Sequence, residues 1–178
     1  IGYLGNGLSA GATWRAHPQL ALAVSVRSGG SLDLRIADTV IASGRMPDRF
    51  GAAVRFDGIP GASVAVSVER TGWSSLGELS QTSLTAQDVW EVGAGIELSG
   101  PKLRTVPSLL YLGYRTRDLP FAIEGKSVPE RFYTGGVGIP IAGPRVVLDM
   151  ALQHATRGPA VGVTERAWIV SVGFTVRP

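Results

Sequence analysis

The chain has 178 residues, no cysteine, only 17% charged residues and a formal net charge of +3. This length suits one domain, the lack of cysteine excludes disulfides and thiolate metal sites, and the scattered basic residues argue against nucleic-acid binding. Mean hydropathy is high at +0.19, although no apolar run approaches the roughly 18 residues of a membrane helix.

The first half of the chain alternates apolar residues with small or polar ones, which predicts β-strands. The strands are expected near residues 8–15, 20–27, 32–36, 50–57 and 63–69. Tight turns are expected at His17-Pro18, at Gly29-Gly30 and around Pro60, because Gly and Pro favour turn conformations. A longer polar link is expected between the third and fourth strands.

The second half continues the pattern, with strands near residues 90–98, 109–115, 132–139, 146–153 and 166–178. Short turns are expected at Gly100-Pro101 and Gly143-Pro144. Long loops are expected at Gly72–Gln87, Thr116–Glu130 and His154–Glu165. Long and short links thus alternate over most of the chain, as they do in outer-membrane barrels with long external loops and short periplasmic turns.

The final strand shows the clearest alternation. Trp168, Val170, Val172 and Phe174 share one face, and small or polar residues share the other. We expect this strand to close a barrel and to engage the barrel-assembly machinery.

These patterns predict an all-β fold, an antiparallel up-and-down transmembrane β-barrel with about ten strands in residues 1–178, treated as a single domain. The expected location is the bacterial outer membrane, with lipid as a partner of the apolar face. A soluble β-barrel or sandwich that binds an apolar ligand inside also alternates and remains an alternative. The small, uniform Val, Leu and Ala residues of the apolar face favour lipid.

Aromatic residues near the predicted strand ends are candidates for the membrane interface. They are Trp14, Trp73, Trp90, Tyr114, Trp168 and Phe174.

Charged residues on the polar faces are candidates for the barrel lumen, since Arg or Lys facing lipid near mid-bilayer costs about 2–4 kcal/mol. They are Arg27, Asp33, Arg35, Arg55, Asp57, Glu69, Glu91, Glu97, Arg115, Asp149 and Arg177. Two interpretations remain open: a structural network of paired charges, or the lining of a permeation path or ligand pocket.

No motif predicts an enzyme, a cofactor or a metal. Gly7–Gly11 matches G-x-S-x-G but leads into a strand, whereas a nucleophile elbow needs a strand, a turn and a helix. Gly125-Lys126-Ser127 lacks the first glycine of a phosphate loop, because position 120 is Pro120. His17 and His154 are interpreted as surface or rim residues without further metal ligands at suitable spacing.

Several segments together resemble the C-terminal part of FadL-type long-chain fatty acid transporters and the related PorV-like barrels. They are Met46–Gly51, Val106-Pro107, Leu112–Arg115, Leu119–Phe121, Phe132–Gly138 and the final strand. The resemblance implies a barrel of fourteen strands and passive transport of hydrophobic small molecules, fatty-acid-like or aromatic. The family's N-terminal hatch and Asn-Pro-Ala signature have no counterpart in this sequence, so we expect a chain without the hatch and the first strands. The PorV-like alternative is a non-transporting barrel for anchoring, assembly or secretion.

Overall fold

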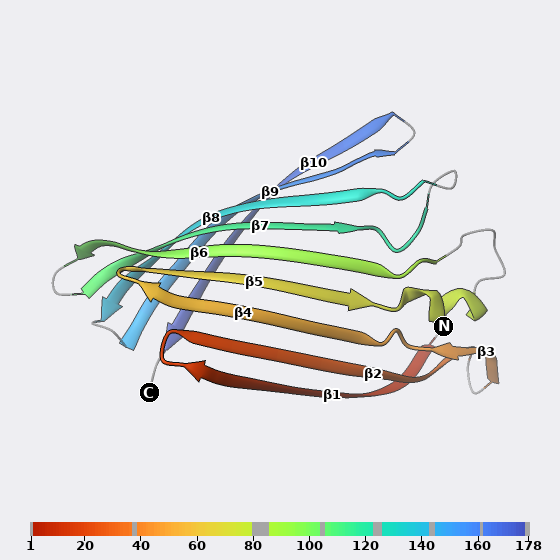
Figure 1. Cartoon of the computed structure of the whole chain (residues 1–178). Coiled ribbons are helices and arrows are strands. Elements are labelled where there is room, and N and C mark those ends of the chain that lie inside the picture. Colours follow the sequence, from red (N-terminus) through yellow and green to blue (C-terminus); the bar gives the residue numbers. More distant parts are fainter. Residues whose placement is uncertain are drawn as a thin grey trace.

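The computed structural model describes residues 2–36, 39–79, 86–103, 106–122, 126–142, 145–160 and 162–176. It is one curved antiparallel sheet, and the chain also includes the short 3-10 helix η1 (Trp73–Leu79) (Figure 1). The strands are β1 (Gly2–His17), β2 (Leu20–Ile36), β3 (Thr39–Arg45), β4 (Arg49–Ile59), β5 (Ala62–Thr71), β6 (Val89–Leu103), β7 (Val106–Asp118), β8 (Pro129–Ala142), β9 (Val146–Ala160) and β10 (Val163–Val176).

The sheet has the up-and-down order expected from the sequence. Its strands follow the path β1-β2-β4-β5-β6-β7-β8-β9-β10, and β3 pairs with β2 off this path. The sheet coils, so that β9 and β10 run obliquely to the strands from β1 to β7 (Figure 1). β1 and β10 are its two edges, and the described residues include no pairing between them. The all-β antiparallel prediction is therefore confirmed, in the form of an open sheet.

The third strand differs from the prediction. Gly29-Gly30 does not form a hairpin turn, because β2 continues through both glycines to Ile36 and pairs with β1 on both sides of a register shift between Gly5 and Gly7. Neighbouring parts of the chain lie very close to both glycines. A Cβ on Gly29 would overlap the Met46 carbonyl oxygen, and a Cβ on Gly30 would overlap the Asn6 side chain. Glycine permits another segment to approach the backbone of a strand closely. A pair of glycines in the sequence is equally compatible with a turn.

On the side away from β1, β2 consequently pairs with two strands. Its first half pairs with β4 from Leu20 to Arg27, and its second half pairs with β3 from Ser31 to Ile36. The segment expected to be a polar link thus contains β3. The predicted loop from His154 to Glu165 is also wrong, since β9 extends to Ala160 and β10 begins at Val163. The charged residues Arg157 and Glu165 give this segment the polar composition of a loop, although it continues two strands.

Few apolar side chains in the described ranges are buried. They are Val89, Leu119, Val128, Phe132 and Val147. Three of them lie next to the long links: the Leu119 amide donates to the Val128 carbonyl at 2.8 Å, and Ala86 forms an isolated bridge with Phe121. The packing is therefore concentrated where two loops meet, whereas most of the sheet covers no conventional hydrophobic core.

Candidate functional site

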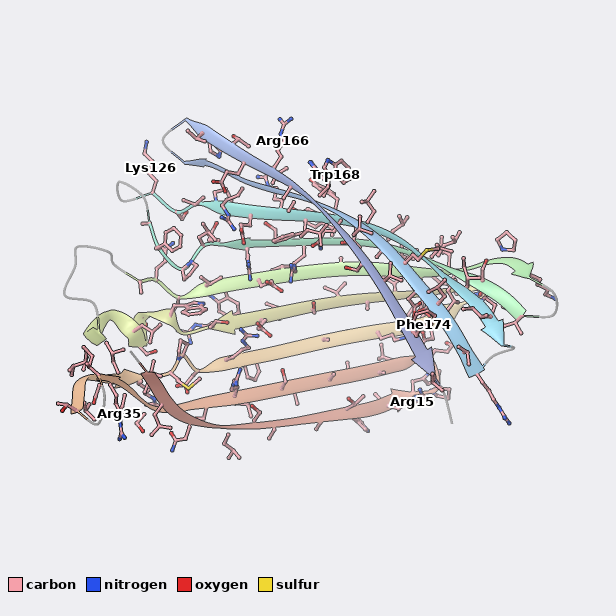
Figure 2. The ribbon with its side chains drawn as sticks, turned by 180° about the vertical axis from the view of Figure 1, so that it is seen from behind. Arg15, Arg35, Lys126, Arg166, Trp168 and Phe174 are labelled. Atoms are coloured by element: carbon pink, nitrogen blue, oxygen red, sulfur yellow. The ribbon has the colours of Figure 1, made fainter. Side chains whose placement is uncertain are left out.

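The two faces of the sheet differ in chemistry. We call the face with the large exposed apolar residues the outer face, and the face with the paired charges and pockets the inner face. Trp168 is 66% exposed and Phe174 is 69% exposed, and both lie along β10 (Figure 2). Val66 and Leu112, on strands in the middle of the sheet, are 50% and 57% exposed. A water-soluble barrel would turn this face inward, so the exposure favours contact with an apolar medium.

Aromatic residues on the outer face form a row across four neighbouring strands. The register places Tyr114, Tyr133, His154 and Trp168 beside one another on β7, β8, β9 and β10. The ring centroids of Tyr114 and Tyr133 are 5.1 Å apart, and those of His154 and Trp168 are 4.5 Å apart. Trp73 differs from the other predicted interface aromatics, because it lies in η1 and not at a strand end.

Four glutamates and four arginines lie across the inner face from β4 to β10, and we call them the charge belt. They form two ion-paired sets that adjoin where Glu69 and Glu91 lie opposite each other. The members of the belt are Arg49, Glu69, Glu91, Arg115, Arg117, Glu130, Arg157 and Glu165. Five of them lie directly opposite one another in the strand register, in the order Glu91, Arg117, Glu130, Arg157, Glu165. Strict alternation of sign at directly opposed positions stabilises each strand pair.

Glu130 is the centre of the belt. Its carboxylate accepts from the Arg117 Nε at 2.7 Å and from the Arg157 Nε at 2.7 Å, and its side chain is 5% exposed. The arginines at its sides are 39% and 47% exposed, so the belt has a buried acid and two half-exposed bases. Glu130 therefore depends on its two arginines, because an unpaired buried carboxylate is strongly unfavourable.

Phe132 lies next to this acid on β8 and receives two guanidinium groups on its ring. The Arg115 Cζ lies 4.2 Å from the ring centroid, and the Arg117 Cζ lies 5.7 Å from it. These are cation–π distances. Each of the two arginines also contacts Glu91 at 3.5 Å, so the belt and the aromatic ring hold both side chains in place.

A pocket of about 610 Å³ opens beside the belt, over β7 to β10. Its polar wall includes Arg115, Arg117, Glu130 and Arg157, whereas Phe132 and Ile169 belong to its apolar wall. This volume falls within the range of small-molecule sites, and an apolar surface with a few polar groups is their usual composition. This pocket is therefore a candidate binding site.

Small residues cover the inner face next to the belt. Smaller pockets of about 410 and 290 Å³ lie over Ala53, Ser67, Gly93, Gly95 and Gly113, among other residues. A Cβ added to Gly113 would meet its nearest neighbours at 3.7 and 3.8 Å, an ordinary contact distance. This band of small residues therefore has open space in front of it, into which a larger side chain could project.

A second polar group lies nearer the short turns. Arg55 donates to Asp57 and Ser63 at 2.8 Å and contacts Glu97 at 3.4 Å. On neighbouring strands, Asp149 accepts from Tyr111 at 3.2 Å and from Thr175 at 2.9 Å. The inner face thus carries charges toward both ends of its strands and small residues between them.

The predicted lumen charges that the structure describes do not all lie together. Glu69, Glu91 and Arg115 belong to the charge belt, and Arg55, Asp57, Glu97 and Asp149 belong to the polar groups nearer the short turns. Arg27 lies directly opposite Arg49. Asp33 and Arg35 lie instead on the extension of β2, where Asp33 accepts from Ser43 of β3. Arg177 lies outside the described residues, and a role of any of these side chains in permeation stays a prediction.

Sequence reasoning missed five members of the belt: Arg49, Arg117, Glu130, Arg157 and Glu165. Four of them fell within segments taken as loops, and Arg49 fell in the polar link before the predicted fourth strand. The signal was present: Arg115 and Arg117 are two residues apart, as are Glu130 and Phe132, so the inner-face alternation continues past the predicted strand ends.

Neither a metal site nor a membrane helix is found in the parts of the chain that the structure describes. No cluster of three or more His, Asp or Glu residues there could hold a metal ion. None of the described helices has the length and apolar composition needed to cross a bilayer.

Comparison with solved structures shows the fold. The chain is similar to the CymD monoaromatic hydrocarbon channel, with a TM-score of 0.71 and 16% sequence identity. The similarity covers 97% of this chain and 51% of that channel, so the chain spans about half the length of the channel. No family model matches the sequence, and no curated protein matches it. The similarity therefore shows that the chain shares the antiparallel sheet fold of that structure, and at this identity it shows the fold alone.

Proposed function

We propose that this chain forms the wall of a bacterial outer-membrane β-barrel that passes hydrophobic small molecules, and that it has no enzymatic role. The observation that carries the proposal is the distribution of the two faces. Large apolar residues are exposed on the outer face, while the inner face carries paired charges, small residues and a pocket of about 610 Å³. The similarity to a hydrocarbon channel and the resemblance to FadL-type transporters support the same proposal.

Lipid contact requires that the sheet be closed. Unpaired backbone groups at β1 and β10 would each cost several kcal/mol in the hydrocarbon region, so spanning sheets have no open edges. We propose that further strands close the barrel between these two edges, as in the larger barrel that the FadL resemblance implies. The channel to which the chain is similar has about twice its length, which is consistent with additional strands.

The proposed path runs along the inner face. A hydrophobic molecule enters at the end with the long links, reaches the pocket over β7 to β10, and continues along the band of small residues. Glycine and alanine there present no side chains that would narrow the path. Passive movement along such a wall needs no covalent step and no cofactor.

A pair of neighbouring tryptophan substitutions tests the path. Gly113→Trp adds a large side chain to the inner face, and Leu112→Trp adds the same side chain to the outer face of the same strand, where Leu112 is 57% exposed. We expect Gly113→Trp to reduce uptake of a radiolabelled aromatic hydrocarbon by Gram-negative cells, and Leu112→Trp to leave it unchanged. Lipopolysaccharide slows direct diffusion in such cells, so uptake reports the channel.

The same samples test membrane insertion. The protein should extract only with detergent and migrate faster before boiling, as a closed barrel does. A monodisperse species in buffer alone would contradict the membrane proposal. A folded, surface-located barrel whose uptake of hydrocarbon equals that of cells without it would contradict transport and favour the anchoring alternative.

A further inference from the structure

The outer face carries a short polar row near its long links, which we call the basic row. It consists of Thr116 on β7, Arg131 on β8, Thr156 on β9 and Arg166 on β10, which lie beside one another in the strand register. We infer that the basic row binds a phosphate group of a lipid in the surrounding membrane leaflet. The inference rests on the proposed location in the outer membrane, and it assigns a binding site to the face that the transport path does not use.

The level of the basic row in the membrane follows from the aromatic residues beside it. Each of its members is two positions along its strand from Tyr114, Tyr133, His154 or Trp168, so both sets share the outer face. Figure 2 shows Arg166 and Trp168 on the same side of β10. Two steps of ~3.3 Å on a strand tilted by about 40° place the basic row ~5 Å nearer the long links. Tyrosine and tryptophan mark the headgroup level of a membrane, so the arginines reach the lipid phosphates of the external leaflet.

The two arginines of the basic row have no carboxylate partner among the described residues. Both are exposed, whereas Arg70, on the outer face at the same end, pairs with Asp88 at 2.6 Å. The nearest described acid in the register of this face is Asp118, which lies opposite Pro129 and one outward-facing position beyond the row. It forms no ion pair with Arg131 in the described part of the chain. Both guanidinium groups are therefore available to an anion from the surroundings.

The spacing of the arginines suits one phosphate group. Arg131 and Arg166 are two strands apart, which separates their backbones by ~9.6 Å, and Thr156 lies between them. Long arginine side chains can converge on one phosphate from both sides, and guanidinium groups bind phosphate oxygens in pairs. Lys126 lies at the same end of the sheet and adds a cation (Figure 2). The occupant that fits is lipid A, the phosphorylated anchor of lipopolysaccharide, with its phosphate on the arginines and its acyl chains along the apolar outer face.

Binding of lipid A to the full-length protein tests the inference. Native mass spectrometry of the detergent-solubilised protein measures its affinity for lipid A with both phosphates and for the same lipid after its phosphates are removed. The wild type should bind the phosphorylated lipid at least about tenfold more tightly. Glucose 1-phosphate, a soluble phosphate ester, should not displace the lipid at equal concentration, because the acyl chains of the lipid add apolar contacts on the outer face.

Two double variants remove the same charge from opposite ends of the sheet. Arg131→Gln combined with Arg166→Gln should weaken binding of phosphorylated lipid A roughly 25-fold, about fivefold for each arginine, and leave the dephosphorylated lipid within about twofold. Lys102→Gln combined with Arg145→Gln removes two exposed cations beside the short turns and should leave both affinities unchanged. The mobility of unboiled samples on gels reports whether each variant is folded.

The outcomes separate this inference from the proposed function. Equal wild-type affinity for the two lipids, or no binding of either, overturns the inference, and this comparison decides even if a variant fails to fold. A folded arginine double variant with wild-type affinity also overturns it, as does an equal loss in the control variant or displacement by glucose 1-phosphate. The Gly113→Trp uptake experiment decides the transport proposal independently, because it concerns the inner face and does not depend on lipid phosphate.

Discussion

Val66 gives the sharpest test of the outer face as a lipid-contacting surface. It is the fifth residue of the ten-residue strand β5 and is 50% exposed. Four steps from Ala62 at ~3.3 Å, with a strand tilt of about 40°, place it ~10 Å from the turn end along the membrane normal. The apolar band of such barrels is about 25 Å tall, so Val66 lies close to the midplane.

Val66→Arg should therefore destabilise the protein by about 3 kcal/mol, the cost of Arg on a lipid face near mid-bilayer. Its cross-strand neighbours are Val54 and Ala94, which offer no carboxylate. Ser67→Arg is the matched control on the inner face. Its neighbours Ala53 and Gly93 leave room, and Glu69 lies two residues along the same strand, so the cost should stay below about 1 kcal/mol.

Denaturant-induced unfolding in lipid vesicles, followed by mobility of unboiled samples on gels, measures both costs. A difference of about 3 kcal/mol corresponds to more than a hundredfold change in the folding equilibrium. Equal costs for the two variants, or a larger cost for Ser67→Arg, would refute the assignment of the outer face to lipid.

Three further variants test local features. Ser74 donates hydrogen bonds from its hydroxyl and its backbone amide to Asp88, and these bonds, with Arg70 nearby, hold the pKa of Asp88 below its usual value. The stabilisation is therefore complete above the usual pKa and disappears as the pH falls through the lowered pKa. Asp88→Ala should raise amide hydrogen exchange in η1 at neutral pH and abolish the acid dependence of that exchange. Gly29→Ala should cost more than about 1 kcal/mol and raise exchange in β3, because the added methyl would overlap Met46; unchanged exchange would contradict the close approach. Val128→Ala should cost about 2 kcal/mol, since Val128 is 2% exposed, and protease nicking of the link between β7 and β8 should increase, whereas wild-type resistance would mean that the loops do not depend on this contact.

The strands of the central sheet could be predicted because alternation is a local property. In β5 and β6 each successive side chain changes face, so the sequence alone separates Val64, Val66 and Val68 from Ser63, Ala65 and Ser67. The same rule placed most of the predicted charges on the inner face. The boundaries were less accurate where charged residues continue a strand, as at Arg117 and Arg157, because polar composition also characterises loops.

The pairing of β2 with both β3 and β4 could not be predicted. The Gly29-Gly30 pair satisfies the chemistry of a hairpin turn as well as that of a crowded strand, and only the positions of Met46 and Asn6 distinguish them. Local sequence therefore supported two conformations, and contacts with distant residues selected one.

The sequence by itself determined that the chain is an antiparallel all-β protein with one apolar and one polar face, because strand periodicity is set by backbone geometry. Only the tertiary structure decided which charges meet. Glu91, Arg117, Glu130, Arg157 and Glu165 come from five strands, and they form one belt because the register aligns them. Register depends on hydrogen bonding between strands and not on the periodicity within one strand, and a shift of two residues would preserve every face while separating every pair.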